Sequence, residues 1–286
     1  MNTKTNDPLK ASLWMLGALV SFTLIGVSGK EIAAQLVTAE VMFLRSLIGL
    51  GIILTIILLT DRNWTVLKTQ RLGLHVVRNL AHFVGQFGWL FGVALIPLAE
   101  VFAIEFTAPL WVAVFAPFFL GERLNKVRVA AILLGFIGIL VVARPGYVEI
   151  SPGMIAVVIG AMGFAGSMIM TKKLTATERP IAILFYMSFI QTPISFAVAG
   201  GDISLPTGMG WFWLIMISVC GLTAHYSMAK AFSYGEATLV VTMDFFRLPL
   251  IAVVAALVYA EPITIWVVIG GGLILLANYV NVKSAK

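Results

Sequence analysis

Long apolar stretches alternate with short polar segments along almost the whole chain. A helix needs about 20 mainly apolar residues to cross the hydrocarbon core of a bilayer. Stretches of about that length lie near 11–29, 39–60, 74–96, 98–120, 127–143, 153–171, 181–200, 211–231, 237–259 and 264–282. The pattern predicts an all-α integral membrane protein with ten transmembrane helices and almost no soluble part.

Composition supports a membrane location, because the 286 residues are 60% hydrophobic and only 11% charged, against roughly 25% charged residues in soluble domains. If the N-terminus is cytoplasmic, fourteen Lys and Arg residues lie on the cytoplasmic side and only Lys30 and Arg144 on the other. Cytoplasmic loops of membrane proteins carry such an excess. We expect both termini in the cytoplasm of a multi-pass plasma membrane protein of the bacterial inner-membrane type. The net charge of +6 then requires no nucleic-acid partner.

The two halves of the chain share a sequence pattern. "APLWVAVFAPFFLGERLNKVRVAAILLGFIGILVV" lies over "LPLIAVVAALVYAEPITIWVVIGGGLILLANYV", so Pro109 meets Pro249 and Glu122 meets Glu261. Five spans is an odd number, so the second copy enters the membrane from the opposite side. The pattern predicts inverted five-helix repeats over 1–145 and 146–286, as in carriers that work by alternating access. A duplication retained only for packing is the alternative, since channels also contain such repeats.

Three segments carry a family resemblance. They are "FTAPLWVAVFAPFFLGERL" at 106–124, its weaker echo "FRLPLIAVVAALVYAEPIT" at 246–264, and "FLRSLIGLGIILTIILL" at 43–59. In these segments and in its five-plus-five arrangement the chain resembles the EamA family of the drug/metabolite transporter superfamily. The resemblance implies a secondary carrier, often an exporter of amino acids, related metabolites or drugs, with a cavity between the repeats. Pro262 stands where the first copy has Arg123, a departure that sets the two loop glutamates apart.

Polar residues within the predicted spans indicate which faces avoid lipid, because a charged side chain at the centre of a bilayer costs at least about 2.5 kcal/mol. On the third span a polar stripe recurs at helical spacing, which places it on one face turned away from lipid. Its members are His75, Arg78, Asn79, His82 and Gln86. His75 and Arg78 either belong to this interior face or extend to the membrane surface, whereas His82 and Gln86 lie too deep for the second interpretation.

Two acids lie close before two prolines at similar places in the halves, Glu105 before Pro109 and Asp244 before Pro249. Asp244 and Arg247 are three residues apart, so they share a helix face and can neutralise each other. We expect both prolines to act as hinges, with a helix kink at Pro249. Arg45 and Glu105 have similar depths in the membrane, which makes an ion pair between them a candidate. Burial disfavours a charged carboxylate and a nearby arginine favours it, so proton coupling is a possible role.

Further candidates for the substrate or coupling site are Trp89, His225 and Tyr226. His225 either relays protons or binds substrate, or it is a core histidine that bonds to a nearby carbonyl. We expect no metal site and no cofactor, because two distant histidines lack a third ligand. "GVSGKE" at 26–31 has the wrong spacing for a phosphate loop, which argues against ATP coupling.

We therefore expect a carrier rather than an enzyme, since HExxH and GxSxG motifs are absent from the sequence. The expected substrate is a small polar, zwitterionic or heterocyclic metabolite such as an amino acid, moved by alternating access with proton or counter-substrate coupling. A uniporter or channel-like facilitator, or an exchanger for an adenosyl or nucleoside compound, is the alternative. Membrane lipid is the other expected partner.

Overall fold

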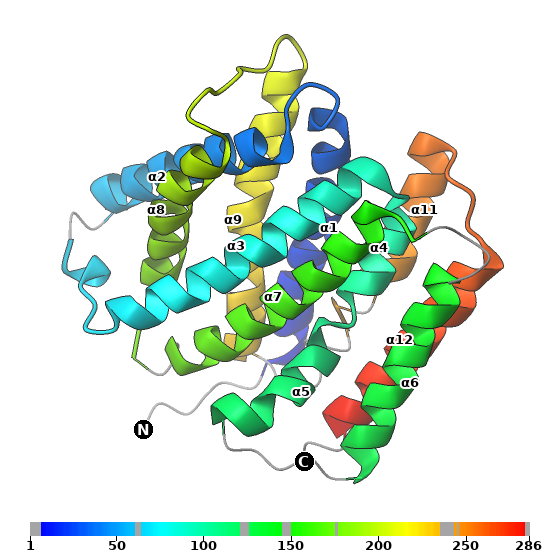
Figure 1. The fold of residues 1–286 in the computed structure, drawn as a ribbon. Coiled ribbons are helices and arrows are strands. Elements are labelled where there is room, and N and C mark those ends of the chain that lie inside the picture. Colours follow the sequence, from blue (N-terminus) through cyan, green and yellow to red (C-terminus); the bar gives the residue numbers. More distant parts are fainter. Residues whose placement is uncertain are drawn as a thin grey trace.

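The computed structural model describes residues 7–60, 64–120, 126–144, 150–174, 177–234, 243–244 and 246–283. All its elements in these ranges are helices (Figure 1). They are α1 (Pro8–Ile32), α2 (Thr38–Thr60), the 3-10 helix η1 (Trp64–Leu67), α3 (Leu72–Leu95), α4 (Leu98–Glu105), α5 (Ala108–Leu120), α6 (Lys126–Ala143), α7 (Pro152–Leu174), α8 (Pro180–Val198), α9 (Gly210–Tyr234), α11 (Arg247–Tyr259) and α12 (Ile265–Lys283). The predicted loop residues Glu122 and Arg123 lie outside the described ranges.

Helix limits follow local sequence signals. The Oδ1 atom of Asp7 accepts a hydrogen bond from the N–H of Lys10 at 3.0 Å, and Pro8 occupies the first position of α1. Such a cap satisfies a donor that has no partner within the helix. The same backbone N–H of Lys10, followed by its ammonium, lowers the pKa of the Asp7 carboxyl below its ordinary value.

Six stretches in the described part of the chain are long and apolar enough to cross a membrane. They are Leu9–Ile32, Thr38–Leu59, Leu98–Phe115, Pro152–Leu174, Pro180–Val198 and Met209–Met228. Three apolar helices are shorter, Val129–Ala143, Arg247–Tyr259 and Ile265–Val280. In the described residues the prediction of an all-α fold with several helices able to cross a membrane is therefore confirmed.

Two of the predicted spans are not single helices. The span predicted at 98–120 divides into α4 and α5, which are separated at Phe106 and Thr107. In the span predicted at 237–259, α11 begins only at Arg247. The predicted kink at Pro249 is therefore wrong. Pro249 lies in the first turn of α11, as Pro109 does in α5, where the missing N–H of proline costs no helical hydrogen bond.

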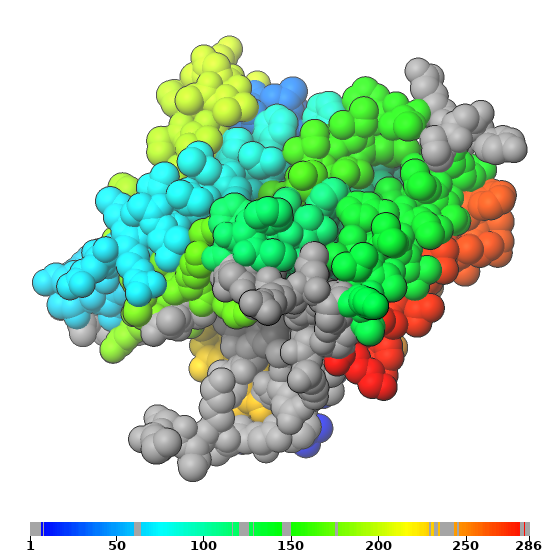
Figure 2. Space-filling model, turned by 60° about the horizontal axis from the view of Figure 1, so that its bottom comes forward, coloured from blue at the N-terminus to red at the C-terminus, as the bar shows by residue number. Residues whose placement is uncertain are grey.

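The helices pack in pairs that are distant in sequence. α1 lies against α9, α3 against α7, α2 against α8, and α6 against α12. Figure 1 shows α3 crossing the molecule beside α7, and Figure 2 shows α12 (red) along α6 (green). Pairing of α3 with α7 requires glycine, because a Cβ atom on Gly88 would lie 2.2 Å from the carbonyl oxygen of Ala156. Small residues allow membrane helices this close approach.

Candidate functional site

A cluster of three charged side chains lies where the two broken spans meet. Nη2 of Arg247 is 3.1 Å from Oε1 of Glu105 and 3.1 Å from Oδ2 of Asp244. The three side chains are only 8%, 13% and 18% exposed, in the order Arg247, Glu105 and Asp244. Burial of charges is tolerated when they are paired in this way. The cluster, called the charged trio below, joins the end of α4 to the start of α11.

The trio corrects one expectation and modifies another. The predicted ion pair between Arg45 and Glu105 is wrong, because Glu105 pairs with Arg247. The predicted pair between Asp244 and Arg247 is present, but it crosses the start of α11 rather than following one continuous helix face. Sequence spacing gave the right partner because the chain still makes a turn between the two residues.

Trp89 on α3 completes the surroundings of Glu105. Its Nε1–H donates to Oε2 of Glu105 at 2.7 Å, so each carboxylate oxygen of Glu105 has a donor. Trp89 was predicted as a site residue, and the structure places it at the trio.

The break between α4 and α5 is stabilised by α12, a helix that is distant in the sequence. Thr107 donates its hydroxyl to the carbonyl of Ile104 at 2.7 Å, and Nδ2 of Asn278 on α12 donates to the carbonyl of Phe106 at 2.6 Å. A carbonyl at a helix end needs such a partner when it is buried. Asn278 therefore satisfies the peptide next to the trio, a role the sequence did not indicate because the two residues are far apart in the chain.

The polar stripe on α3 faces the interior as predicted. His75, Arg78, Asn79, His82 and Gln86 are all buried, whereas Leu72, Val76, Val77, Leu80 and Val84 on the opposite face are exposed. Since His75 is 0% and Arg78 4% exposed, these two side chains are covered by the protein itself. α3 is thus polar inside and apolar outside, as expected for a helix in a membrane around a polar interior.

A chain of hydrogen bonds connects Arg45 to His82. With the Gln86 amide oriented so that its oxygen faces Arg45, that oxygen accepts from Nη1 and Nη2 at 2.9 and 3.0 Å, and its nitrogen donates to Oε1 of Gln191 at 2.8 Å. Nε2 of Gln191 lies 3.0 Å from Nδ1 of His82. Because an amide nitrogen only donates, Nδ1 of His82 is the acceptor and the ring proton resides on Nε2.

Arg78 and Asn79 form a second buried network. Arg78 donates Nε to Oγ1 of Thr171 on α7 at 3.2 Å and Nη1 to Oδ1 of Asn79 at 2.7 Å. Asn79 in turn donates Nδ2 to the carbonyl of Tyr186 on α8 at 3.1 Å. Asn79 therefore links α3 to α8, a packing role within the polar stripe.

His225 on α9 lies between the Arg45 chain and the charged trio. Its ring centroid is 5.5 Å from that of His82 and 5.8 Å from that of Phe22. The Phe22 ring in turn lies 4.5 Å from the guanidinium carbon of Arg247. Tyr226, the next residue on α9, is 43% exposed and makes an edge-to-face contact with Trp14. Adjacent helix residues point about 100° apart, so Tyr226 lies away from the site and its prediction is not supported by the geometry.

Gln191, Phe22 and Asn278 were not among the predicted site residues. Gln191 is the one amide side chain in the mainly apolar helix α8, which is the signal that could have identified it. Phe22 is one of 19 phenylalanines, so only its position shows that it bridges Arg247 and His225.

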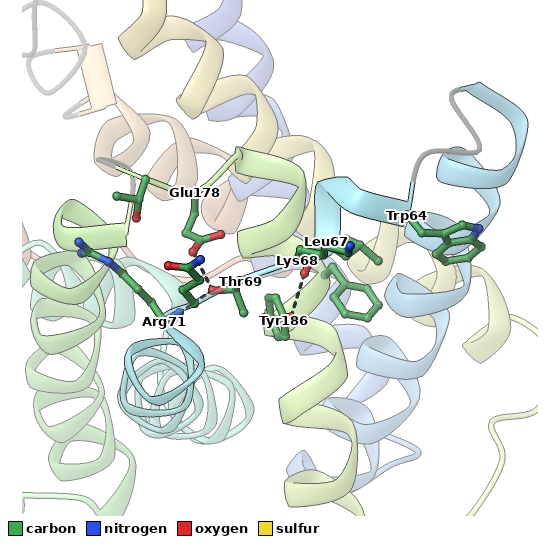
Figure 3. Close-up of a pocket in the computed structure, with 10 residues that line it drawn as sticks. Trp64, Leu67, Lys68, Thr69, Arg71, Glu178 and Tyr186 are labelled. Carbon is green, nitrogen blue, oxygen red and sulfur yellow. Dashed lines mark hydrogen bonds between the residues drawn. The ribbon is translucent and has the colours of Figure 1, made fainter.

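A pocket of about 930 Å3 lies between η1 with the segment that follows it and the N-terminal part of α8 (Figure 3). Glu178 in this pocket accepts a hydrogen bond from Oγ1 of Thr69 at 2.7 Å, and Tyr186 donates its hydroxyl to the carbonyl of Leu67 at 2.9 Å. The residues that line the pocket are Trp64, Leu67, Lys68, Thr69, Gln70, Arg71, Thr177, Glu178, Phe185 and Tyr186. None of the predicted site residues is among them.

An ion pair lies at the C-terminal end of α1. The ammonium of Lys30 contacts Oε1 of Glu261, and Oε2 of Glu261 accepts from the N–H of Leu98 at 2.9 Å. Glu261 therefore joins α1, the start of α4 and the segment after α11. The segment "GVSGKE" lies within α1 up to Glu31, so it is helix rather than a phosphate-binding loop.

Known proteins resemble the chain over most of its length. An S-adenosylmethionine uptake transporter of Rickettsia felis is 29% identical over 260 residues, 90% of this chain and 88% of its own. A riboflavin transporter of Brucella anthropi is 30% identical over 79% of this chain and 84% of its own. The pseudopaline exporter CntI of Pseudomonas aeruginosa is 28% identical over 95% of both chains.

A protein of known crystal structure has the same fold, with a TM-score of 0.67 and 18% identity over 96% of this chain and 97% of its own. The profile of the EamA-like transporter family matches residues 9–144 and again residues 151–282. The relatives and the family are transporters rather than enzymes, which confirms that expectation. The match to a transporter family, together with the apolar helices, shows that the protein is a multi-pass membrane protein. The chain belongs to the EamA-like transporter family.

Proposed function

We propose that the protein is a secondary carrier that moves a small polar metabolite by alternating access. In this proposal ten spans form two inverted five-helix halves, residues 1–145 and 146–286. The two separate matches of the family profile support the division. Carriers of this design exchange the conformations of their halves around a fixed central site.

The packing pairs are consistent with a twofold relation between the halves. If α1, α2, α3 and α6 correspond to α7, α8, α9 and α12, the contact of α1 with α9 becomes the contact of α7 with α3. The contacts of α2 with α8 and of α6 with α12 then map onto themselves. A pseudo-twofold axis in the membrane plane would produce this pattern.

The observation that carries the proposal is the charged trio. It joins the broken span of the first half, through Glu105, to the broken span of the second half, through Arg247. Charges and interrupted helices within a membrane are tolerated where they line a cavity, and transporters place substrate and coupling sites at such points.

The class of substrate follows from the relatives only in outline. S-adenosylmethionine, riboflavin and pseudopaline are the compounds that their names give. We propose a metabolite with a polar heterocycle or an amino-acid part, and the trio with the Arg45 chain as the groups that bind it. Export of an amino acid would be one example of this kind of transport.

Counterflow in proteoliposomes tests the carrier function. Liposomes loaded with unlabelled S-adenosylmethionine or riboflavin should accumulate the labelled compound transiently, which a simple pore does not do. Glu105→Gln and Asp244→Asn should lose counterflow at normal expression, while Leu276→Ala, at a side chain that is 51% exposed, should retain it. Unchanged kinetics in both acid variants would remove the trio from the mechanism.

We also propose proton coupling and cytoplasmic termini in a bacterial inner membrane. Glu105 and Asp244 are the acids that would carry the proton, because both lie within the predicted spans and keep 13% and 18% of their side-chain surface exposed. If the transport rate does not change when a pH gradient is imposed, protons do not drive transport. Orientation is tested with a C-terminal alkaline phosphatase fusion, which should be inactive if this terminus is cytoplasmic.

A further inference from the structure

The guanidinium of Arg247 lies among three phenylalanine rings. Its central carbon is 4.5 Å from the ring centroid of Phe22, 4.9 Å from that of Phe106 and 5.5 Å from that of Phe102. A cation within about 6 Å of an aromatic face is attracted by the ring, and the attraction increases when water is excluded. Groups of aromatic faces around one position bind quaternary ammonium ions in other proteins.

The charges around Arg247 do not balance. Two carboxylates, Glu105 and Asp244, contact one guanidinium, so the charged trio carries one excess negative charge when both acids are ionised. A buried charge without compensation is unfavourable. The trio can therefore accept one further positive charge.

Asp244 is the acid with unused bonding capacity. Both oxygens of Glu105 have donors, Trp89 and Arg247. Asp244 uses Oδ2 for Arg247, whereas its Oδ1 is buried and has no hydrogen-bond partner among the described residues. A buried acceptor without a donor costs about 1–3 kcal/mol. A ligand that approaches Asp244 would remove that cost.

We propose that the three rings and the two acids form the binding site for an onium group, a sulfonium or a quaternary ammonium, of the transported metabolite. Arg247 occupies this site when no substrate is bound. The proposal rests on the carrier function proposed above and narrows its substrate class. Arg247 is the first residue of α11, so its side chain can leave the rings without unwinding a helix interior.

The opposite assignment is that Arg247 binds an anionic group of the substrate. The geometry disfavours it, because Nη2 of Arg247 already contacts a carboxylate oxygen of each acid. An anion would have to approach a guanidinium that two carboxylates surround. The two assignments predict opposite effects of removing an acid, which makes them separable by experiment.

Binding to the purified protein is measured with two matched ligands. S-adenosylmethionine and S-adenosylhomocysteine share the adenosyl and amino-acid parts and differ by one methyl group and the positive charge on sulfur. Isothermal titration should give S-adenosylmethionine a dissociation constant at least about tenfold lower. Phe22→Leu should weaken S-adenosylmethionine about fivefold more than S-adenosylhomocysteine. Equal binding of the two ligands would overturn the proposal.

Asp244→Asn decides between the two assignments of Arg247, and it leaves Arg247 paired with Glu105, which protects the fold. An onium site predicts that S-adenosylmethionine weakens about tenfold more than S-adenosylhomocysteine. An anion site at Arg247 predicts that both ligands, which share a carboxylate, bind more tightly. The second outcome would overturn the proposal.

Binding and counterflow together distinguish failure of the onium site from failure of the carrier function. If neither S-adenosylmethionine nor tetramethylammonium binds at about 1 mM, the onium site is wrong, and counterflow of riboflavin would still establish the carrier. If S-adenosylmethionine binds with the expected preference but no compound shows counterflow, the carrier function is wrong and the onium site remains.

Discussion

The ammonium of Lys30, at the end of α1, contacts the carboxylate of Glu261, the second residue after α11. The other oxygen of Glu261 holds the first N–H of α4, that of Leu98. One side chain thus ties three helices together at one end of the molecule. Under the proposed alternating access, we expect this contact to open in each transport cycle.

A crosslink at this contact should stop transport. In a Cys220→Ala background, Lys30→Cys combined with Glu261→Cys and a short bis-methanethiosulfonate crosslinker, which forms a reducible disulfide with each cysteine, should reduce counterflow to the level of empty liposomes. Reduction should restore it, because only the covalent link prevents the opening. The reduced double variant is the control, and undiminished counterflow of the crosslinked protein would contradict an opening at this end.

The charged trio should behave as one unit in thermal unfolding. Glu105→Gln or Asp244→Asn alone leaves Arg247 with one carboxylate, whereas the double variant leaves a buried guanidinium without either. The loss in the double variant should exceed the sum of the single losses by about 1–3 kcal/mol. Additive effects, measured as melting temperatures in detergent, would show that the three groups are independent.

The contact between α3 and α7 predicts a steric effect. Gly88→Ala places a Cβ atom 2.2 Å from the carbonyl oxygen of Ala156, so the helices have to separate. Overpacking of this kind costs about 1–3 kcal/mol, and the melting temperature should fall. Gly272→Ala is the matched control, because nothing lies within 4 Å of its Cβ position, and alanine is favoured over glycine in a helix by about 1 kcal/mol. Equal melting temperatures for the two variants would contradict the close packing.

The hydrogen-bond chain predicts the cost of removing its centre. Gln191→Leu leaves Nδ1 of His82 and the amide of Gln86 without their partner, which should cost about 1–3 kcal/mol of stability for each buried group left unpaired. Thr55→Val also removes one side-chain hydrogen bond, to the carbonyl of Gly51, but at an exposed position, and should change the melting temperature little. A Gln191→Leu protein as stable as Thr55→Val would show that the chain is absent.

Several features of the site could be predicted from local sequence. The stripe from His75 to Gln86 repeats at helical spacing, so a single helix is enough to place its residues on one face. Asp244 and Arg247 meet because they are only three positions apart in the chain. Pro109, shortly after Glu105, and Pro249, shortly after Asp244, indicated where the spans break. They did not indicate that a new helix begins at each break. Pro109 and Pro249 lie in the first turns of α5 and α11 instead of bending continuous helices, because the first turn is where proline fits without loss of a bond.

Contacts between distant segments could not be predicted. Glu105 has a similar depth to Arg45, yet it pairs with Arg247, since depth alone does not say which helices are neighbours. Gln191 and Asn278 lie in mainly apolar helices, and their partners, His82 and the carbonyl of Phe106, lie far from them in the sequence. Tyr226 failed as a prediction because the position of α9 turns His225 inward and Tyr226 outward.

By itself the sequence determined that the chain crosses a membrane, which faces of its helices avoid lipid and which family it belongs to. These properties depend on the transfer of side chains between water and hydrocarbon, which is local to each segment. Only the tertiary structure decided that Arg247 lies between two acids and three phenylalanine rings. That arrangement depends on which helices come into contact, and helix contacts in a membrane are set by shape and hydrogen bonding rather than by hydrophobicity.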